Sequence, residues 1–455
     1  YYLMAIKEND SDAMFNLGLL YKNQEKYELA EKYYLMAIKE NHIGAINNLG
    51  SLYDDQEKYN LAEKYYLMAI KENNSEAMFN LGLLYDNLEK YELAEKYYLM
   101  AIKENDSDAM FNLGLLYANQ EKYELAEKYY LMAIKENDSD AMYNLGLLYY
   151  SQEKYELAEK YYLMAIKENH IGAMNNLGSL YYDQEKYNLA EKYYLMAIKE
   201  NDSDAMFNLG LLYANQEKYE LAEKYYLMAI KENDSDAMYN LGLLYYSQEK
   251  YELAEKYYLM AIKENHIGAM NNLGSLYYDQ EKYNLAEKYY LMAIKENDSD
   301  AMFNLGLLYK NQEKYELAEK YYLMAIKENH IGAINNLGSL YDDQEKYNLA
   351  EKYYLMAIKE NNSEAMFNLG LLYDNLEKYN QAEKYYSMAI KENHSGAMFN
   401  LGLLYYNQEK YDNAEKYLKM ALEYGHKDAK ILLDNIKIEL KNKISREATI
   451  SWIFK

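Results

Sequence analysis

The sequence predicts an all-α fold, a solenoid of about 14 stacked antiparallel helix pairs with 32 residues per pair. Two observations predict it. First, a Tyr-Tyr pair recurs without insertion or deletion at positions 1, 33, 65, 97, 129, 161, 193, 225, 257, 289, 321, 353 and 385, and Tyr417-Leu418 continues the series. Second, each repeat contains two segments whose apolar residues have helical spacing. A single pair cannot bury its apolar face, so neighbouring repeats must cover it.

Each repeat reads as two helices joined by short turns. In the first full repeat we expect helices over about residues 12–21 and 25–40, with Asp10 or Ser11 capping the first. Gly18 lies inside the first helix, where Gly costs ~1 kcal/mol relative to Ala. That cost is reasonable if a neighbouring helix approaches closely at this point.

The composition indicates tandem copying. The chain has 455 residues with 61 Tyr, 25 Met, no Pro and no Cys. Residues 97–192 recur letter for letter as 193–288, and residues 1–96 recur as 289–384 with two changes. Agreement between repeats is therefore weak evidence of constraint, because the copies may be too recent to differ.

Charge and motifs exclude several classes of function. The net charge of −25 is spread over the repeats, and no basic stripe precedes the last 40 or so residues, so nucleic-acid binding is not expected. No apolar run reaches transmembrane length. There is no phosphate loop, nucleophile elbow or zinc motif, so we expect no enzymatic activity, no cofactor and no bound metal.

The spacing within a repeat resembles the tetratricopeptide repeat. The matching positions in the first repeat are Met14, Leu17, Gly18, Tyr21, Tyr27, Ala30, Tyr34 and Ala37. The period is two residues shorter than the 34 of that family, and the junction resembles that of its Sel1-like relative, as in residues 41–50 and 424–429. The resemblance covers residues 1 to about 430. It implies a right-handed superhelix whose concave groove, lined by the first helices, binds proteins or peptides.

Differences between repeats concentrate at positions that the resemblance places in this groove. We predict ligand-facing roles for Phe15, Asn47, Phe79, Phe111, Tyr143, Asn175 and Tyr239 at one position, and for Leu19, Ser51 and Ser179 at another. Lys22, Asp54, Asp86, Tyr150, Tyr182 and Tyr246 form a third position, and the invariant Asn16, Asn48, Asn80, Asn112, Asn144 and Asn176 a fourth. The alternative is neutral drift at exposed sites, but drift would not readily choose Phe and Tyr there. An acidic groove favours a basic or aromatic-rich protein or peptide.

Three further features recur with the repeats. The six histidines (His42, His170, His266, His330, His394 and His426) share one position, where we expect a helix C-terminus that suits a cation. The Tyr-Tyr-Leu-Met stripe is expected to pack between repeats. Possible glycosylation sequons fall at Asn9, Asn73, Asn105, Asn137, Asn201, Asn233, Asn297, Asn361 and Asn393.

The C-terminal stretch differs from the rest, so we expect a solenoid over residues 1–427 and a cap over 428–455. Over 428–445, apolar residues at Leu432, Ile436, Leu440 and Ile444 oppose Lys437, Lys441 and Lys443, as a capping helix requires. Trp452-Ile453-Phe454 follows and either folds back or docks elsewhere. Because the chain begins at Tyr1 within a repeat, we expect upstream residues or a cover at that end. The compartment, cytoplasmic or secreted, is not indicated.

The sequence thus predicts a non-catalytic scaffold that binds protein or peptide ligands along its concave face. The alternative is a structural protein that self-associates into filaments by solenoid stacking, through its uncapped end and its acidic, Tyr-rich faces. The varied groove positions favour the scaffold, whereas the monotony of the copies favours the filament.

Overall fold

The structure is a computed structural model that describes residues 9–453, with side chains described for residues 9–441. Between residues 9 and 453 it contains 27 helices and no strand. Each full repeat contributes a first and a second helix of 13 residues each. The predicted all-α solenoid of antiparallel helix pairs is therefore confirmed.

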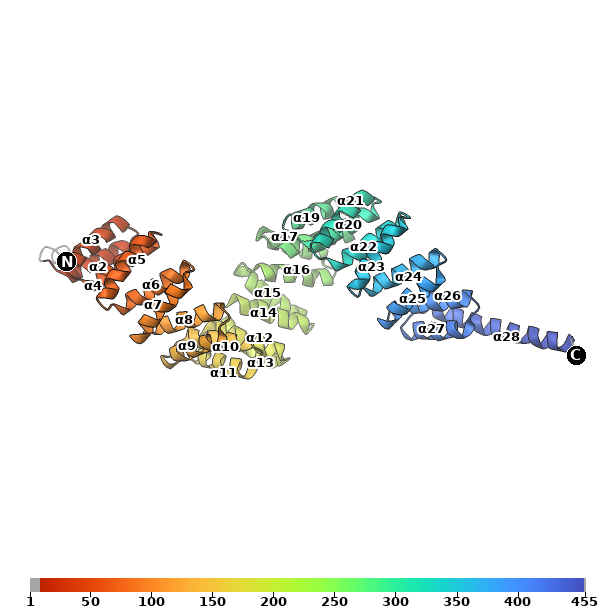
Figure 1. Ribbon diagram of the computed structural model, residues 1–455, viewed down its shortest axis with the longest axis horizontal. Coiled ribbons are helices and arrows are strands. Elements are labelled where there is room, and N and C mark those ends of the chain that lie inside the picture. Colours follow the sequence, from red (N-terminus) through yellow and green to blue (C-terminus); the bar gives the residue numbers. More distant parts are fainter. Residues whose placement is uncertain (1–8, 454–455) are drawn as a thin grey trace. The chain divides into compact units, whose positions relative to one another are not determined.

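The first of two compact units spans residues 1–232. Figure 1 shows its helix pairs packed one after another along the chain. Its first helices are α2 (Ser11–Asn23), α4 (Ile43–Asp55), α6 (Ser75–Asn87), α8 (Ser107–Asn119), α10 (Ser139–Ser151), α12 (Ile171–Asp183) and α14 (Ser203–Asn215). Its second helices are α3 (Tyr27–Lys39), α5 (Tyr59–Lys71), α7 (Tyr91–Lys103), α9 (Tyr123–Lys135), α11 (Tyr155–Lys167), α13 (Tyr187–Lys199) and α15 (Tyr219–Lys231).

The second compact unit spans residues 233–455 and has the same organisation. Its first helices are α16 (Ser235–Ser247), α18 (Ile267–Asp279), α20 (Ser299–Asn311), α22 (Ile331–Asp343), α24 (Ser363–Asn375) and α26 (Ser395–Asn407). Its second helices are α17 (Tyr251–Lys263), α19 (Tyr283–Lys295), α21 (Tyr315–Lys327), α23 (Tyr347–Lys359), α25 (Tyr379–Lys391) and α27 (Tyr411–Glu423), and α28 (Ala429–Ile453) follows.

The turns between helices are set by one residue in the left-handed region. Glu25 has φ 58°, so the second helix begins at Tyr27, two residues later than predicted. The N–H of Lys26 donates to the carbonyl of Tyr21 at 2.9 Å, as in a Schellman motif. Asn41, with φ 62°, ends the second helix in the same way.

The core of each repeat is a glycine packed against a tyrosine ring. A Cβ on Gly82 would lie 2.6 Å from Cδ1 of Tyr98, and Tyr98 is fully buried. The predicted close approach at this glycine is confirmed, and the approaching group is a side chain of the second helix in the same repeat. In the last repeat Leu418 takes the place of the ring against Gly402.

Within each compact unit, every second helix packs on the first helix of the following repeat. The first helices of neighbouring repeats also approach one another, whereas the described second helices of neighbouring repeats do not. The row of first helices is therefore the more closely spaced side of the stack. This spacing lets side chains of adjacent first helices bond to one another, and it leaves gaps between adjacent second helices.

The last helix packs on α26 and α27 through the buried Leu433 and Ile436, with Leu432 and Leu440 half-buried. It continues as a helix to Ile453, eight residues beyond the end predicted at 445. The side chains of the predicted apolar tail, Phe454 and the start at Tyr1 lie outside the described residues. The domain boundary at 428 and the superhelical hand stay predictions.

Candidate ligand-binding face

A side chain caps the N-terminus of the first helix in nearly every repeat. Asp106 Oδ1 accepts from the N–H of Ala109 at 2.9 Å, and His170 Nδ1 accepts from the N–H of Ala173 at 3.1 Å. The expectation that the histidines benefit from a helix C-terminus is wrong. Each turn is so short that five of the six histidines occupy the N-cap of the next first helix, where Nδ1 accepts a backbone N–H of the first turn. Nδ1 of His426 makes no such hydrogen bond.

The aromatic residues at the Phe15 position are half-buried between repeats. The Tyr143 ring stacks on His170 with ring centroids 4.4 Å apart, and it also tilts against Tyr162 at 6.2 Å. Phe15 contacts His42 in the same way, at 4.5 Å. The prediction that these rings are water-exposed is wrong, because each is half-buried against a tyrosine of its own repeat, and a histidine cap of the next repeat covers a further face of rings such as Phe15 and Tyr143.

The asparagines of the first helices form hydrogen bonds between adjacent repeats. Asn80 Nδ2 donates to Oδ1 of Asn47 at 3.1 Å, and Asn47 is only 1% exposed. Asn208 and Asn175 repeat this bond at 3.0 Å. The predicted ligand-facing roles of Asn47 and Asn175 are therefore wrong, since neighbouring repeats bury them. Four other predicted asparagines donate to different acceptors. Asn176 donates to the Tyr143 hydroxyl, and Asn16, Asn112 and Asn144 donate to backbone carbonyls in their own helices.

The variable position near the end of the first helix also contacts the following repeat. Lys22 Nζ lies 2.8 Å from Asp55 Oδ2 and donates to Ser51 Oγ at 2.8 Å. Tyr150 and Tyr246 donate to the carboxylates of Asp183 and Asp279. The hydrogen bond to Asp183 raises the pKa of Tyr150 to about 12, with burial adding to the effect.

Of the remaining predicted residues at these positions, Leu19 is exposed, whereas Ser51, Asp54, Asp86, Ser179 and Tyr182 are half-buried. Burial, and then the charge of Asp55, raise the pKa of Asp54 above its ordinary value. Burial raises the pKa of Asp86 as well, and Tyr98 donates to this carboxylate at 3.4 Å. Ser179 accepts from the hydroxyl of the buried Tyr194 at 3.2 Å.

The two helices of a repeat carry different charge. Every first helix from α2 to α24 contains at least one Asp or Glu, and Lys22 and Lys310 are the only basic residues in the described helices α2 to α26 of this kind. Both lysines are held in ion pairs at 2.8 Å, with Asp55 and Asp343. The first-helix face, made of the exposed and half-buried residues of the first helices, is therefore acidic and has no unpaired lysine.

Comparison with known proteins identifies the family. Tetratricopeptide repeat models match residues 47–109, 84–140, 111–172, 175–237, 229–268 and 271–333, and two further models of that description match residues 11–41, 331–364, 363–395 and 395–424. The chain belongs to the tetratricopeptide repeat family. None of the curated proteins compared with it matches in sequence.

Solved structures resemble this tetratricopeptide repeat chain at low identity. One is c5321, a protective antigen present in uropathogenic Escherichia coli strains and displaying an SLR fold, with 18% identity, a TM-score of 0.48 and coverage of 94% of this chain and 96% of that chain. A Sel1 repeat protein from Oxalobacter formigenes has 26% identity, a TM-score of 0.38 and coverage of 47% and 98%. The human IFIT1 dimer with PPP-AAAA has 17% identity, a TM-score of 0.41 and coverage of 84% and 95%.

Contact between neighbouring repeats also occupies these variable positions. The contacting residues are 33 apart, and an Asp stands opposite both Lys22 and Tyr150, as Asp55 and Asp183. Reading the sequence at this offset would have found the pairs. In a first helix such as α8, the exposed Asp108 and Asn119 remain accessible to a ligand. The half-buried Phe111, Asn112 and Leu115 lie between them.

The described residues contain no group of three or more His, Cys, Asp or Glu placed to hold a metal ion. In the same part of the chain, no helix combines the length and the apolar character needed to cross a membrane. The nine sequon asparagines are all exposed at the turns between repeats, and their glycosylation stays a prediction.

Proposed function

We propose that this tetratricopeptide repeat chain is a non-catalytic scaffold that binds a basic or aromatic-rich protein segment along its first-helix face. The observation that supports this proposal is the charge of this face. Successive repeats place carboxylates on it, and its two lysines are already held in ion pairs. A partner that supplies cations would complement it and associate faster.

The half-buried rings suit the apolar part of such a segment. Phe111 lies against Tyr130 with ring centroids 6.1 Å apart and keeps part of its surface open. The exposed Asp108 precedes it by one helical turn on the same helix, so a cation and an apolar side chain of the partner can meet neighbouring groups.

Fluorescence anisotropy with the full chain tests this proposal. The probe is a labelled peptide in which Lys and Arg alternate with Tyr and Trp, and the control peptide replaces its cations with Asp and Glu. We expect binding of the basic peptide alone, with an affinity that falls as salt screens the charges. Equal affinity for the two peptides, or none for either, would overturn the proposal.

Substitution of Phe79, Phe111 and Phe207 by Asn locates the site. The chain itself places Asn at this position in α4 and α12, so the helices tolerate the change. We expect peptide binding to be lost while helix content, measured by circular dichroism, is kept. The matched control changes Leu93, Leu125 and Leu221 of the second helices to Gln, as in Gln381, and should bind normally. Retained binding in the Phe variant would move the ligand off this face.

Self-association into filaments is the second candidate, and it is favoured by the near-identity of the copies. Negative-stain imaging at rising concentration separates the two. Filaments that lengthen with concentration would support assembly, whereas discrete particles of constant length would support the scaffold.

A further inference from the structure

The exposed and half-buried residues of the second helices form a surface that we call the second-helix face. In several repeats this face carries a similar apolar groove. In α7 it is lined by Leu99 and Met100, with Glu92, Glu95, Lys96 and Lys103 around them. The groove of α9 repeats this set, and those of α13 and α19 repeat it with Asn in place of the first glutamate. The expectation that the Tyr-Tyr-Leu-Met stripe packs between repeats is only half right. Tyr97 and Tyr98 are buried, but Leu99 and Met100 remain half-open.

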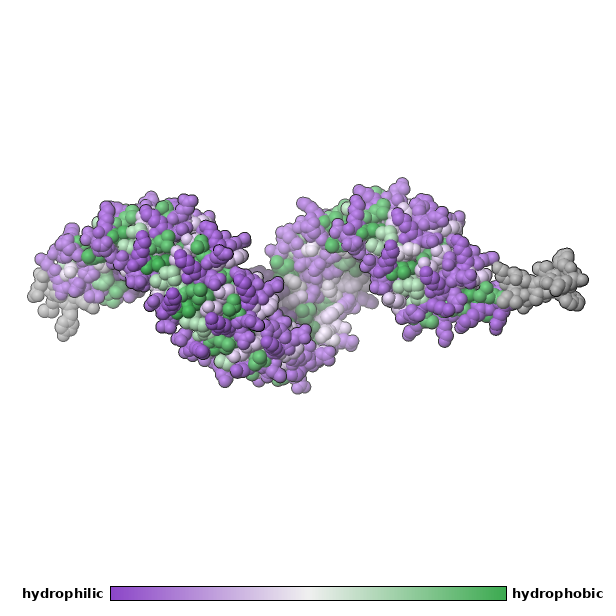
Figure 2. All heavy atoms as spheres, turned by 60° about the horizontal axis from the view of Figure 1, so that its bottom comes forward, coloured by the Kyte–Doolittle hydropathy of each residue, from purple (hydrophilic) through white to green (hydrophobic). Residues whose placement is uncertain are grey.

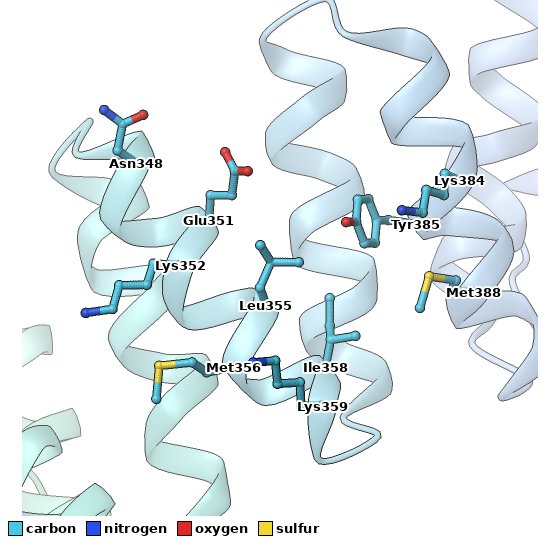
Figure 3. A pocket seen from close by; sticks show the side chains of 10 residues that line it. All are labelled: Asn348, Glu351, Lys352, Leu355, Met356, Ile358, Lys359, Lys384, Tyr385 and Met388. Atoms are coloured by element: carbon cyan, nitrogen blue, oxygen red, sulfur yellow. The ribbon is translucent and has the colours of Figure 1, made fainter.

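The largest of these grooves, about 780 Å³, lies between α23 and α25. Figure 3 shows Leu355 of α23 and Tyr385 of α25 both pointing into the space between the two helices. Lys384 and Glu351 stand at its edges. The groove exists because the backbones of neighbouring second helices stay apart, so the apolar side chains between them are left partly uncovered.

A row of exposed leucines runs beside the grooves. In the first compact unit these are Leu29, Leu61, Leu93, Leu125, Leu157, Leu189 and Leu221, each 38–39% exposed. Leu93, Lys96 and Met100 share one face of α7 by helical spacing, so the exposed leucine and the groove form one surface. Single exposed leucines are ordinary, but one per repeat in a fixed register makes a row of regularly spaced apolar patches. Figure 2 shows apolar patches recurring between hydrophilic ones along the surface.

The charge around this patch favours a second copy of the chain as the occupant. In α7 two glutamates, Glu92 and Glu95, balance two lysines, Lys96 and Lys103, and α9 has the same balance, whereas α13, α19 and α23 have Asn in place of the first glutamate. Two such faces attract as much as they repel and can pair Glu with Lys across the contact, whereas two first-helix faces would meet as like charges. We propose that the second-helix faces of two copies bind side by side, with the exposed leucines of one copy in the Leu–Met grooves of the other.

The repeat period makes this contact additive. Both copies present a similar surface every 32 residues, so neighbouring repeats can add further leucine–groove contacts to the first. A single leucine buries little, and a stable interface buries about 1,200–2,000 Å² in total, so several repeats must take part. The repeat of α25 interrupts the row, because Gln381 and Ser387 replace the exposed and the groove leucine there.

Sedimentation equilibrium of the full chain over a range of concentrations tests the proposal. The variant copies the natural exception: Leu93, Leu125, Leu157 and Leu189 to Gln, with Leu99, Leu131, Leu163 and Leu195 to Ser. The helix of α25 keeps its length and its buried Ala382 and Tyr386 with these residues, so the variant should fold. We expect the parent to dimerise reversibly, and the variant to raise the dimer dissociation constant at least about tenfold.

The control and the outcomes separate this proposal from the peptide-binding function. Phe79, Phe111 and Phe207 to Asn, on the other face, should leave the dimer unchanged, and the Leu variant should still bind the basic peptide. High salt should preserve the dimer, which is apolar at its centre, while weakening peptide binding. A parent that stays monomeric at every concentration, or a dimer that survives the Leu changes, would overturn the proposal. So would a dimer that only the Phe changes dissociate.

Discussion

The contact between Gly82 and Tyr98 recurs in every described repeat except the last, and a larger residue at the glycine would have to displace the ring. We expect Gly82→Leu to lower the free energy of unfolding by ~1–3 kcal/mol, because the side chain overpacks the buried ring. Urea unfolding followed by circular dichroism measures it. Asn87→Leu, at an exposed position of the same helix, should have little effect. An unchanged urea unfolding curve for the Gly82 variant would show that the ring can move aside.

Ionisation of Asp54 and of its copy Asp342 destabilises the folded chain at neutral pH. Burial and the adjacent carboxylate raise both pKa values, so the folded state favours the protonated form. The stabilisation that protonation of these carboxyls gives to the folded chain is fully present below about pH 3.9, their pKa in the unfolded chain. It is lost as the pH rises through their pKa in the folded chain. We therefore expect Asp54→Asn with Asp342→Asn to raise the melting temperature at pH 7 and to bring no gain near pH 3. An equal gain at both pH values would contradict this cause.

At the scale of the element, each turn stores strain in a non-glycine residue. Glu121 has φ 59°, and the left-handed region costs an L-residue roughly 1–2 kcal/mol. We expect Glu121→Gly to stabilise the chain by about 0.5–1 kcal/mol, part of the relief being offset by the greater freedom of the unfolded chain. Gly425, with φ 87°, already uses this solution.

The same substitution inside a helix should act in the opposite direction. Glu124→Gly, within α9, is expected to destabilise by about 0.5–1 kcal/mol, because helical φ gains nothing from glycine. Urea midpoints of the two variants give the comparison. If both variants destabilise equally, the turn is not strained.

At the scale of the whole molecule, the order of the repeats matters as well as their number. Removing residues 97–192 leaves every junction intact, because 193–288 is an exact copy. Removing residues 33–128 takes away the same number of residues but places Lys22 opposite Ser151 in place of Asp55, and Phe15 beside Asp138 in place of His42.

We expect the first deletion to keep the thermal midpoint close to that of the parent, since stability is a sum of neighbour terms. The second should lower the stability of its new junction by about 1–2 kcal/mol, through the lost ion pair and ring stack. Differential scanning calorimetry of the two chains, which have equal length, measures the difference. Identical melting curves would mean that any repeat stacks on any other.

The period, the two helices of each repeat and the close glycine contact follow from the sequence alone. They depend on residues a few positions apart, whose apolar spacing and conformational preferences act within one helix or one turn. Gly18 indicated a close contact because a glycine inside a helix lowers its stability, and a closely packed neighbour offsets this loss.

Only the tertiary structure decided which surfaces are covered and which are free. It showed that histidines such as His42 cap the following helix, that Asn47 is buried by the next repeat, and that Leu99 and Met100 are left half-open. These outcomes depend on the rotation and spacing of one helix against another. That geometry is set by many side chains packing together, with partners such as Lys22 and Asp55 a whole repeat apart, and no pattern within a single repeat records it.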